Sequence, residues 1–163
     1  MIKALTLLIF ISSSFLIACK PLFDTGLMDG WFNQGTELVA GDYAPQDHWS
    51  GEWRMVNIWA EWCKPCWQEI PQLNQFFTLQ GSEGVKLIGF NFDELDAEDL
   101  APVAKRFNLK LPSLISHPRE IWGIETPPAV PATFFINPEG VVVESLFRPQ
   151  TKDSLNSIYA SIK

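Results

Sequence analysis

Two cysteines stand three residues apart in the stretch WAEWCKPCWQEIP, which runs from Trp59 to Pro71. Cys63 and Cys66 follow an apolar segment typical of a strand and precede a segment whose apolar residues have helical spacing. A pair at this spacing can be a redox couple, half of a metal site or a structural crosslink. A structural crosslink would stabilise the fold little, because the loop that it closes is very short.

The position of the pair favours thiol chemistry. A cysteine at a helix N-terminus lies near unpaired backbone N–H groups and the positive end of the helix dipole, which lower its pKa from about 8.5 toward 7 or below. Cys63 is therefore the predicted nucleophile, and the charge of Lys64 favours its thiolate. Cys66, one turn further on, would attack the mixed disulfide and release the product, so the two form a reversible disulfide. Pro65 would make the turn between them rigid.

A redox couple fits the cysteine pair better than most metal and cofactor sites do. A tetrahedral zinc site needs four ligands. Beyond the two cysteines only His48 and His117 could serve, and their spacing does not match that of a zinc motif. Covalent haem attachment needs a histidine where Trp67 stands. A copper(I) metallochaperone is the open alternative, because two thiolates and a distant histidine can hold that ion. The preferred interpretation requires no metal and no bound cofactor.

The segments around the cysteines predict a crossover unit. RMVNIW at residues 54–59 and VKLIGFNF at residues 85–92 are predicted strands, the second buried on both faces. Between them, KPCWQEIPQLNQFFTLQ is a predicted helix that places Ile70, Leu73 and Phe77 on one face. Two strands joined through a helix make a right-handed crossover.

The rest of the chain predicts two more helices and a hairpin. DAEDLAPVAKRF is a helix in which Pro102 is acceptable if the first turn begins near Asp99. ATFFI and VVVESLF are strands joined by the turn NPEG, and Thr151 can cap a closing helix. The apolar stripe of that helix consists of Leu155, Ile158, Tyr159 and Ile162. The order of elements predicts an α/β layered domain.

Composition limits the function classes. The chain has 163 residues, of which 47% are hydrophobic and 19% charged, enough for one globular core. Its formal net charge is −7, and no block of Lys and Arg interrupts this acidity. A nucleic acid is therefore excluded as a partner.

The N-terminus predicts export. Residues 1–18, MIKALTLLIFISSSFLIA, carry one positive charge and then an apolar run, as in a signal peptide. A membrane span needs about 20 apolar residues, and this run is shorter and ends at a cysteine. LIAC, Leu16 to Cys19, resembles the lipobox of bacterial lipoproteins, which implies that Cys19 becomes lipidated and anchors the protein to a membrane. Lys20 resembles lipoproteins sent on to the outer membrane. Residues 19–50 are then a lipidated tether and extension, and residues 51–163 are the globular domain.

The motif WAEWCKPC, followed by VPATFFINPEG, resembles the thioredoxin fold. The closest resemblance is to the TlpA, ResA and CcmG group of exported thiol:disulfide oxidoreductases. Asn57 stands where thioredoxin has a buried Asp, and Glu69 follows three residues after Cys66, as in that group. The resemblance covers residues 51–163 and implies a thioredoxin-like α/β fold, a central mixed β-sheet flanked by helices.

The group also implies roles for residues near the cysteines. Glu69 is expected to accept the proton that activates Cys66, with a pKa raised by burial; an exposed carboxylate in a first helical turn is the alternative. Pro131, preceded by Val130, matches the cis-proline whose loop faces the cysteines and pairs with an extended substrate; a trans proline at a strand start is the alternative. Trp62 is expected to cover the pair.

A protein of this group would be a reductase of disulfides in exported proteins, apocytochrome c among the candidate substrates. It would act on the periplasmic side of a bacterial membrane and receive its electrons from a membrane protein of the DsbD or CcdA type. Pro65 also resembles the reducing members of the superfamily. Two other activities fit less well: copper carriers on this fold space their cysteines more widely, and no Thr and Arg constellation of a peroxidase surrounds Cys63.

Overall fold

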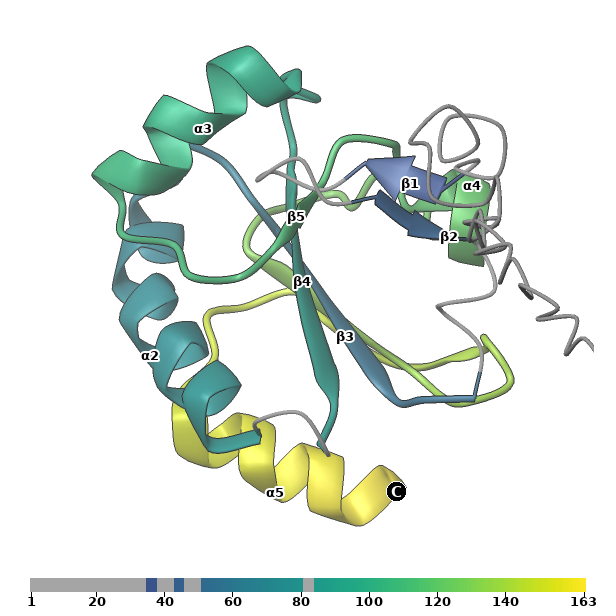
Figure 1. Ribbon diagram of the computed structural model, residues 1–163. Coiled ribbons are helices and arrows are strands. Elements are labelled where there is room, and N and C mark those ends of the chain that lie inside the picture. Colours follow the sequence, from purple (N-terminus) through teal and green to yellow (C-terminus); the bar gives the residue numbers. More distant parts are fainter. Residues whose placement is uncertain (1–34, 38–42, 46–50, 81–83) are drawn as a thin grey trace, which may run out of the picture. The chain divides into compact units, whose positions relative to one another are not determined.

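The computed structural model describes residues 35–37, 43–45, 51–80 and 84–163 (Figure 1). The chain divides into two units, residues 1–31 and 32–163, and every described residue belongs to the second. The predicted signal peptide, Cys19, Lys20 and His48 lie outside the described residues. Within the described residues no helix is both long and apolar enough to cross a membrane.

Five strands form a mixed sheet in the order β5-β4-β3-β6-β7. They are β3 (Arg54–Trp59), β4 (Lys86–Asn91), β5 (Ser113–Leu114), β6 (Ala132–Ile136) and β7 (Val142–Leu146). The central strand β3 pairs in parallel with β4 and antiparallel with β6. A separate antiparallel pair, β1 (Gly35–Glu37) and β2 (Tyr43–Pro45), lies within the stretch expected to be an extension.

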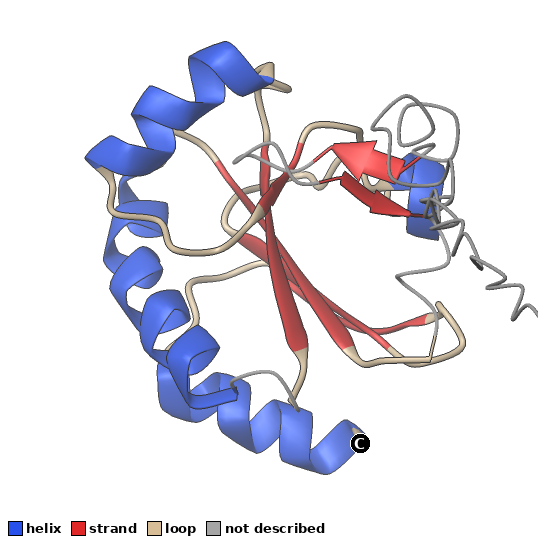
Figure 2. Cartoon of the chain, in the orientation of Figure 1, coloured by secondary structure: helices blue, strands red, loops and turns tan. Residues whose placement is uncertain are grey.

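The helices are α2 (Lys64–Gln80), α3 (Ala97–Arg106), α4 (Arg119–Trp122) and α5 (Lys152–Ile162). Helices α2, α3 and α5 lie on one side of the sheet and the short α4 on the other (Figures 1 and 2). The side chains of β3 point alternately to the two faces of the sheet, as in any strand. Met55 packs with Leu73 of α2 and Leu155 of α5, whereas Val56 belongs to the cluster against which α4 packs. The predicted α/β fold, with a mixed sheet flanked by helices, is confirmed.

Three details differ from the expectation. Helix α3 begins at Ala97, because Asp96 caps it by accepting a hydrogen bond from the backbone N–H of Asp99 at 2.9 Å. Pro102 is therefore the sixth helical residue, beyond the first turn that the sequence suggested. On α2 the buried aromatic residue is Phe76, and the predicted Phe77 is only half-buried. Strand β5 and helix α4 were not expected, since neither is long enough to show a period.

Two local predictions are confirmed. The side chain of Thr151 accepts from the backbone N–H of Ser154 at 3.1 Å, and Ser154 returns a bond to the N–H of Thr151, which completes a capping box on α5. The turn NPEG between β6 and β7 is closed by the N–H of Gly140, which donates to the carbonyl of Asn137 at 2.9 Å. Gly140 has φ +81°, a left-handed conformation that costs glycine little.

Candidate active site

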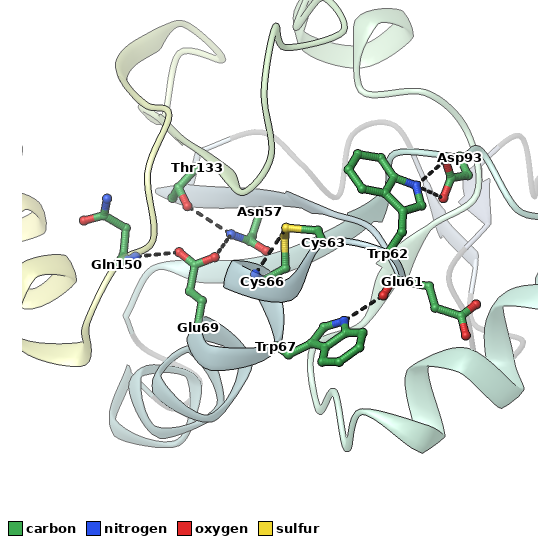
Figure 3. The surroundings of a disulfide bond; sticks show 10 residues. All are labelled: Asn57, Glu61, Trp62, Cys63, Cys66, Trp67, Glu69, Asp93, Thr133 and Gln150. Carbon is green, nitrogen blue, oxygen red and sulfur yellow. Dashed lines mark hydrogen bonds between the residues drawn. A yellow bond between two sulfur atoms is a disulfide. The ribbon is translucent and has the colours of Figure 1, made fainter.

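The two cysteines form a disulfide where β3 leads into α2 (Figure 3). Cys63 immediately precedes α2, and Cys66 is the third residue of that helix. The backbone N–H of Cys66 donates to Sγ of Cys63 at 3.2 Å. The same N–H also donates to the backbone carbonyl of Cys63 at 3.0 Å, so it is shared between two acceptors at the start of the helix. The same N–H would stabilise negative charge on Cys63 after reduction, which is the electrostatic setting expected for a nucleophilic thiolate.

Neither cysteine is open to solvent in this disulfide form. Cys63 is 3% exposed and Cys66 0%. The reason is packing, because both cysteines belong to an apolar cluster built from the end of β3, α2 and α3. Its other buried members are Trp59, Ala60, Ile70, Leu100 and Val103.

Glu69 lies one helical turn after Cys66 and is buried, with 1% of its surface exposed. Its Oε1 accepts from the backbone N–H of Gln150 at 2.9 Å, and its Oε2 accepts from Nδ2 of Asn57 at 3.2 Å. Burial raises the pKa of Glu69 to about 7, although both hydrogen bonds favour the charged form and lower it. The alternative of an exposed carboxylate on the helix surface is wrong. A group with this pKa can hold or accept a proton near neutral pH.

Asn57 and Thr133 connect Glu69 to the sheet. Asn57 on β3 lies opposite Thr133 on β6, and both are completely buried. Nδ2 of Asn57 donates to Oγ1 of Thr133 at 3.0 Å as well as to Glu69. With Gln150, which is 3% exposed, these residues form a buried polar chain beside the disulfide (Figure 3). Sequence reasoning singled out Asn57 and Glu69 but missed Thr133 and Gln150.

The predicted substrate-facing residues lie around the pair. Lys64 and Pro65 are exposed in the first turn of α2. The bond between Val130 and Pro131 is cis, so the trans alternative is wrong, and it directly precedes β6. Val130 packs against the cluster that contains the cysteines. The role of these residues in holding a substrate stays a prediction.

Two exposed tryptophans, Trp62 and Trp67, lie near the disulfide (Figure 3). Nε1 of Trp62 donates to both carboxylate oxygens of Asp93 at 3.0 Å, and its ring meets Phe92 edge-on. Figure 3 shows the Trp62 indole directed toward Asp93 rather than over the sulfur atoms, which differs from its expected role as a cover. Nε1 of Trp67 donates to the carbonyl of Glu61 at 2.7 Å. Both indoles are therefore fixed by hydrogen bonds, while 61% of Trp62 and 44% of Trp67 remain exposed.

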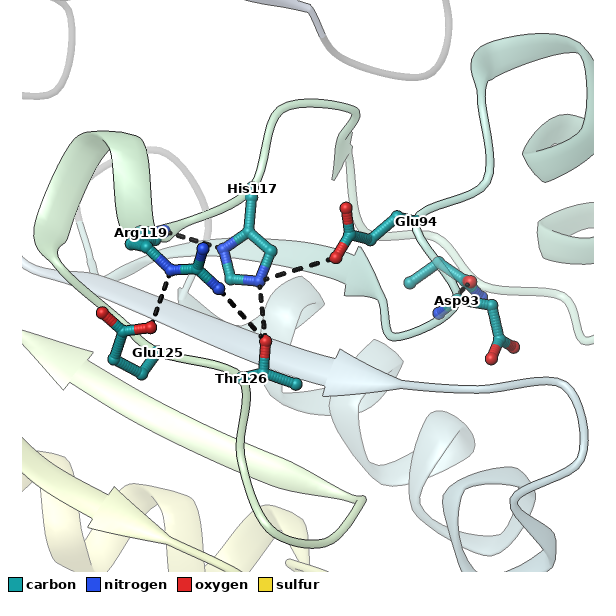
Figure 4. Close-up of polar contacts among 7 residues, drawn as sticks. Asp93, Glu94, His117, Arg119, Glu125 and Thr126 are labelled. Carbon is teal, nitrogen blue, oxygen red and sulfur yellow. Dashed lines mark hydrogen bonds and ion pairs between the residues drawn. The ribbon is translucent and has the colours of Figure 1, made fainter.

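His117, the histidine considered as a copper ligand, takes part in a different polar cluster (Figure 4). Its Nδ1 accepts from the backbone N–H of Arg119 at 3.0 Å, and its Nε2 lies 3.3 Å from Oγ1 of Thr126 and 4.0 Å from Oε1 of Glu94. Its ring also meets Phe90 edge-on. Across the described ranges, no group of three or more His, Cys, Asp and Glu side chains is arranged to hold a metal ion.

Comparison with known proteins places the chain in a family. The model of the AhpC/TSA family matches residues 34–145, and the chain belongs to this family. The match begins within residues 19–50, the stretch assigned from the sequence to a tether and extension. Thiol-disulfide oxidoreductase ResA from Bacillus cereus is 31% identical over 112 residues, which are 69% of this chain and 64% of that protein. ResA from Bacillus thuringiensis subsp. konkukian is 28% identical over 160 residues, 90% of this chain and 91% of that protein. The predicted resemblance to the group that includes ResA is confirmed.

Solved structures show the same fold. StoA from Bacillus subtilis superposes with a TM-score of 0.62 and 22% identity, over 75% of this chain and 92% of that one. A DsbF homologue from Corynebacterium diphtheriae gives a TM-score of 0.65 at 19% identity, over 78% of this chain and 82% of that one. These likenesses confirm the thioredoxin-like fold.

Proposed function

We propose that this chain is a thiol:disulfide oxidoreductase that reduces disulfides of exported proteins. The observation that carries the proposal is the Cys63–Cys66 disulfide at the start of α2, with a helix N–H directed at Sγ of Cys63. The names of the curated relatives, thiol-disulfide oxidoreductases, support the same chemistry. Apocytochrome c is one candidate substrate.

The exchange proceeds in two displacements. The thiolate of Cys63 attacks one sulfur of the substrate disulfide, forms a mixed disulfide and displaces the other substrate sulfur as a thiolate. Cys66 then loses its proton and attacks Sγ of Cys63, which releases the second substrate sulfur. The substrate gains two electrons and two protons, and the protein is left with the Cys63–Cys66 disulfide. A dithiol must then reduce the protein again, which is the role proposed for a membrane donor of the DsbD or CcdA type.

Glu69 is the proposed acceptor of the Cys66 proton. It lies one turn from Cys66 on the same helix, and its pKa of about 7 leaves a large fraction of it ionised near neutral pH. A carboxylate with the usual pKa would be ionised but would attract the proton of a thiol only weakly. Burial therefore makes Glu69 a better base for this step.

A mixed-disulfide trap tests the function. Cys66→Ser removes the resolving thiol, so the substrate should remain attached to Cys63 and be identified by mass spectrometry after nonreducing separation. The matched control, Cys63→Ser, should reduce no disulfide and should trap nothing through Cys66. If Cys66→Ser captures no protein in its native compartment while the wild type binds Cu(I) tightly, the copper carrier is correct and the reductase is wrong.

The direction of electron flow needs a separate measurement. A reductase should have a potential nearer to the value of about −270 mV for thioredoxin than to that of about −120 mV for DsbA. Equilibration of the pair with dithiothreitol or glutathione buffers gives this potential. A value close to that of DsbA would mean that the protein oxidises its substrates instead.

Export and anchoring are proposed from the sequence alone. Residues 1–18 would direct export, and lipid on Cys19 would hold the domain at the periplasmic side of a bacterial membrane, with Lys20 favouring the outer membrane. Cys19→Ala should abolish labelling by radioactive palmitate and release the domain from the membrane, while the thiol chemistry of Cys63 stays intact. Continued labelling of the variant would contradict the lipoprotein proposal.

A further inference from the structure

The amide of Asn57 has one polar atom without a partner. Nδ2 uses its two hydrogens on Oε2 of Glu69 and Oγ1 of Thr133, at 3.2 and 3.0 Å. Oδ1 is buried and accepts no hydrogen bond from any described residue. A buried amide oxygen without a donor is unfavourable and uncommon in folded proteins, so this atom calls for an explanation.

Asn57 and Cys66 meet the same face of α2. Glu69 follows Cys66 by three residues, so the two side chains share one face of α2, and Asn57 contacts that face through Glu69. Figure 3 shows the Asn57 amide between the Glu69 carboxylate and the disulfide. In the disulfide form neither sulfur carries a hydrogen, so neither can donate to Oδ1. Reduction of the pair creates S–H groups, and a thiol is a weak hydrogen-bond donor.

We propose that Asn57 is a positioning residue for Cys66, whose thiol donates a hydrogen bond to Oδ1 in the reduced protein while Nδ2 keeps hold of Glu69. This inference rests on the proposed function, because it requires a pair that cycles between disulfide and dithiol. In that cycle an incoming dithiol supplies two electrons and becomes a disulfide, and the Sγ–Sγ bond breaks. One proton is then held by Cys66, and the other is held by the Cys63 thiol or released to solvent, which leaves a thiolate at Cys63.

The consequence is a bias in the redox equilibrium. The reduced form gains a hydrogen bond that the oxidised form lacks, and the oxidised form keeps an unpaired oxygen. Both effects favour the dithiol. One hydrogen bond of ordinary net strength corresponds to roughly a fivefold change in the equilibrium constant. Removal of Oδ1 should therefore shift the equilibrium toward the disulfide and make the dithiol a stronger reductant.

A pair of variants tests the role of Oδ1; Asn57→Leu also removes the bond from Nδ2 to Glu69, which both redox forms share, so its loss cancels in the redox equilibrium. Asn57→Leu removes both polar atoms with little change in volume, whereas Thr133→Val removes one partner of Nδ2 and leaves Oδ1 in place. Equilibration with dithiothreitol should show about a fivefold shift toward the disulfide for Asn57→Leu, or about 20 mV for this two-electron couple. Thr133→Val should stay within about twofold of the wild type, because the loss of a bond present in both redox forms cancels. Equal shifts in the two variants would overturn the inference.

The S–H stretching band gives a direct reading that needs no change at Asn57. In the full chain with Cys19→Ala and Cys63→Ser, Cys66 is the only thiol. Its band should lie at the lower frequency of a hydrogen-bonded thiol, and Asn57→Leu should raise it; a band at the frequency of a free thiol with Asn57 present would overturn the inference. A failure of the proposed function gives a different result: the wild-type protein would then exchange no disulfides, whatever the frequency of the S–H band. Normal exchange with a free-thiol band rejects only the role of Asn57.

Discussion

The two sides of the cysteine pair are built differently. On the inner side, Thr133, Asn57, Glu69 and Gln150 form a polar chain in which every residue is at most 3% exposed. On the outer side, Trp62 and Trp67 are held by Asp93 and Glu61, and both side chains remain exposed to solvent. We call these groups the inner chain and the outer rim.

The inner chain, and not the outer rim, controls the proton chemistry of the site. In the inner chain, removal from water raises the pKa of Glu69 to about 7 even though two donors hold its carboxylate. In the outer rim, the ion pair between Glu61 and Arg106 is exposed to solvent, which screens it. We therefore expect changes in the inner chain to alter pH dependence and stability strongly, and changes in the outer rim to have small effects.

Glu69→Gln should produce the largest effect. The folded protein binds the Glu69 proton more tightly than the unfolded chain does, so ionisation of Glu69 destabilises the fold as the pH rises from about 4.5 to about 7. Protonated Glu69 thus contributes about 3 kcal/mol to the free energy of unfolding at low pH, and this contribution is fully lost above pH 7. Glu69→Gln does not titrate, so its stability relative to the wild type should increase by about that amount between pH 4 and pH 8. Urea unfolding of the disulfide forms measures it. If the difference in unfolding free energy between the variant and the wild type stayed constant from pH 4 to pH 8, Glu69 would not have the raised pKa on which this prediction rests.

The same variant should change the kinetics. In the wild type, release of substrate from the mixed disulfide should speed up as Glu69 ionises near pH 7. In Glu69→Gln this rise should disappear, and the rate should increase only at higher pH, where the Cys66 thiol loses its proton without a neighbouring base. Stopped-flow reaction with a chromogenic disulfide measures both profiles. Identical profiles would mean that another group accepts the proton.

Trp67→Ala probes the outer rim and should have an intermediate effect. It removes an indole that donates to the carbonyl of Glu61 and packs on Phe107, with ring centroids 5.1 Å apart. Because the ring is 44% exposed, the loss should be about 1–2 kcal/mol, and it should not vary with pH between 5 and 8. Thermal unfolding at several pH values tests this. A loss that follows the titration of Glu69 would show that the rim and the inner chain are coupled.

Arg106→Gln should have the smallest effect. Its ion pair with Glu61 joins side chains that are 59% and 41% exposed. Exposed pairs contribute about 0–1 kcal/mol and weaken with salt. Urea unfolding at low and high salt should show a loss below about 0.5 kcal/mol that vanishes at high salt. A larger, salt-independent loss would show that the outer rim is less screened than its exposure indicates.

The fold could be predicted where the sequence carries a long period or a strong local signal. Strands β3 and β4, helix α2 and the capped helix α5 meet these conditions and lie where expected. The two-residue β5 and the four-residue α4 do not, because their existence depends on tertiary contacts. Pro102 favours a start of α3 near Asp99, whereas the side chain of Asp96 caps the helix and starts it at Ala97.

The candidate site was predictable in part. Cys63, Cys66 and Glu69 stand in one local motif, so helical spacing alone places them together. Thr133 was missed although it is the one polar residue of the strand ATFFI, a signal that could have found it. Gln150 acts through its backbone N–H, which any residue except proline provides, so no side-chain pattern reveals it. The burial of Cys63 depends on packing between α2 and α3, which a linear pattern does not contain.

In the proposed exchange Cys63 is the nucleophile and Cys66 the resolving thiol. Alkylation of the reduced wild type by iodoacetamide across pH 5–9, with each cysteine quantified by mass spectrometry, tests this most directly. The N–H of Cys66 stabilises a thiolate only at Cys63, so Cys63 should titrate near pH 7 or below and react at least about tenfold faster than Cys66 at pH 7. Equal rates, or faster alkylation of Cys66, would contradict the division of roles between the two cysteines.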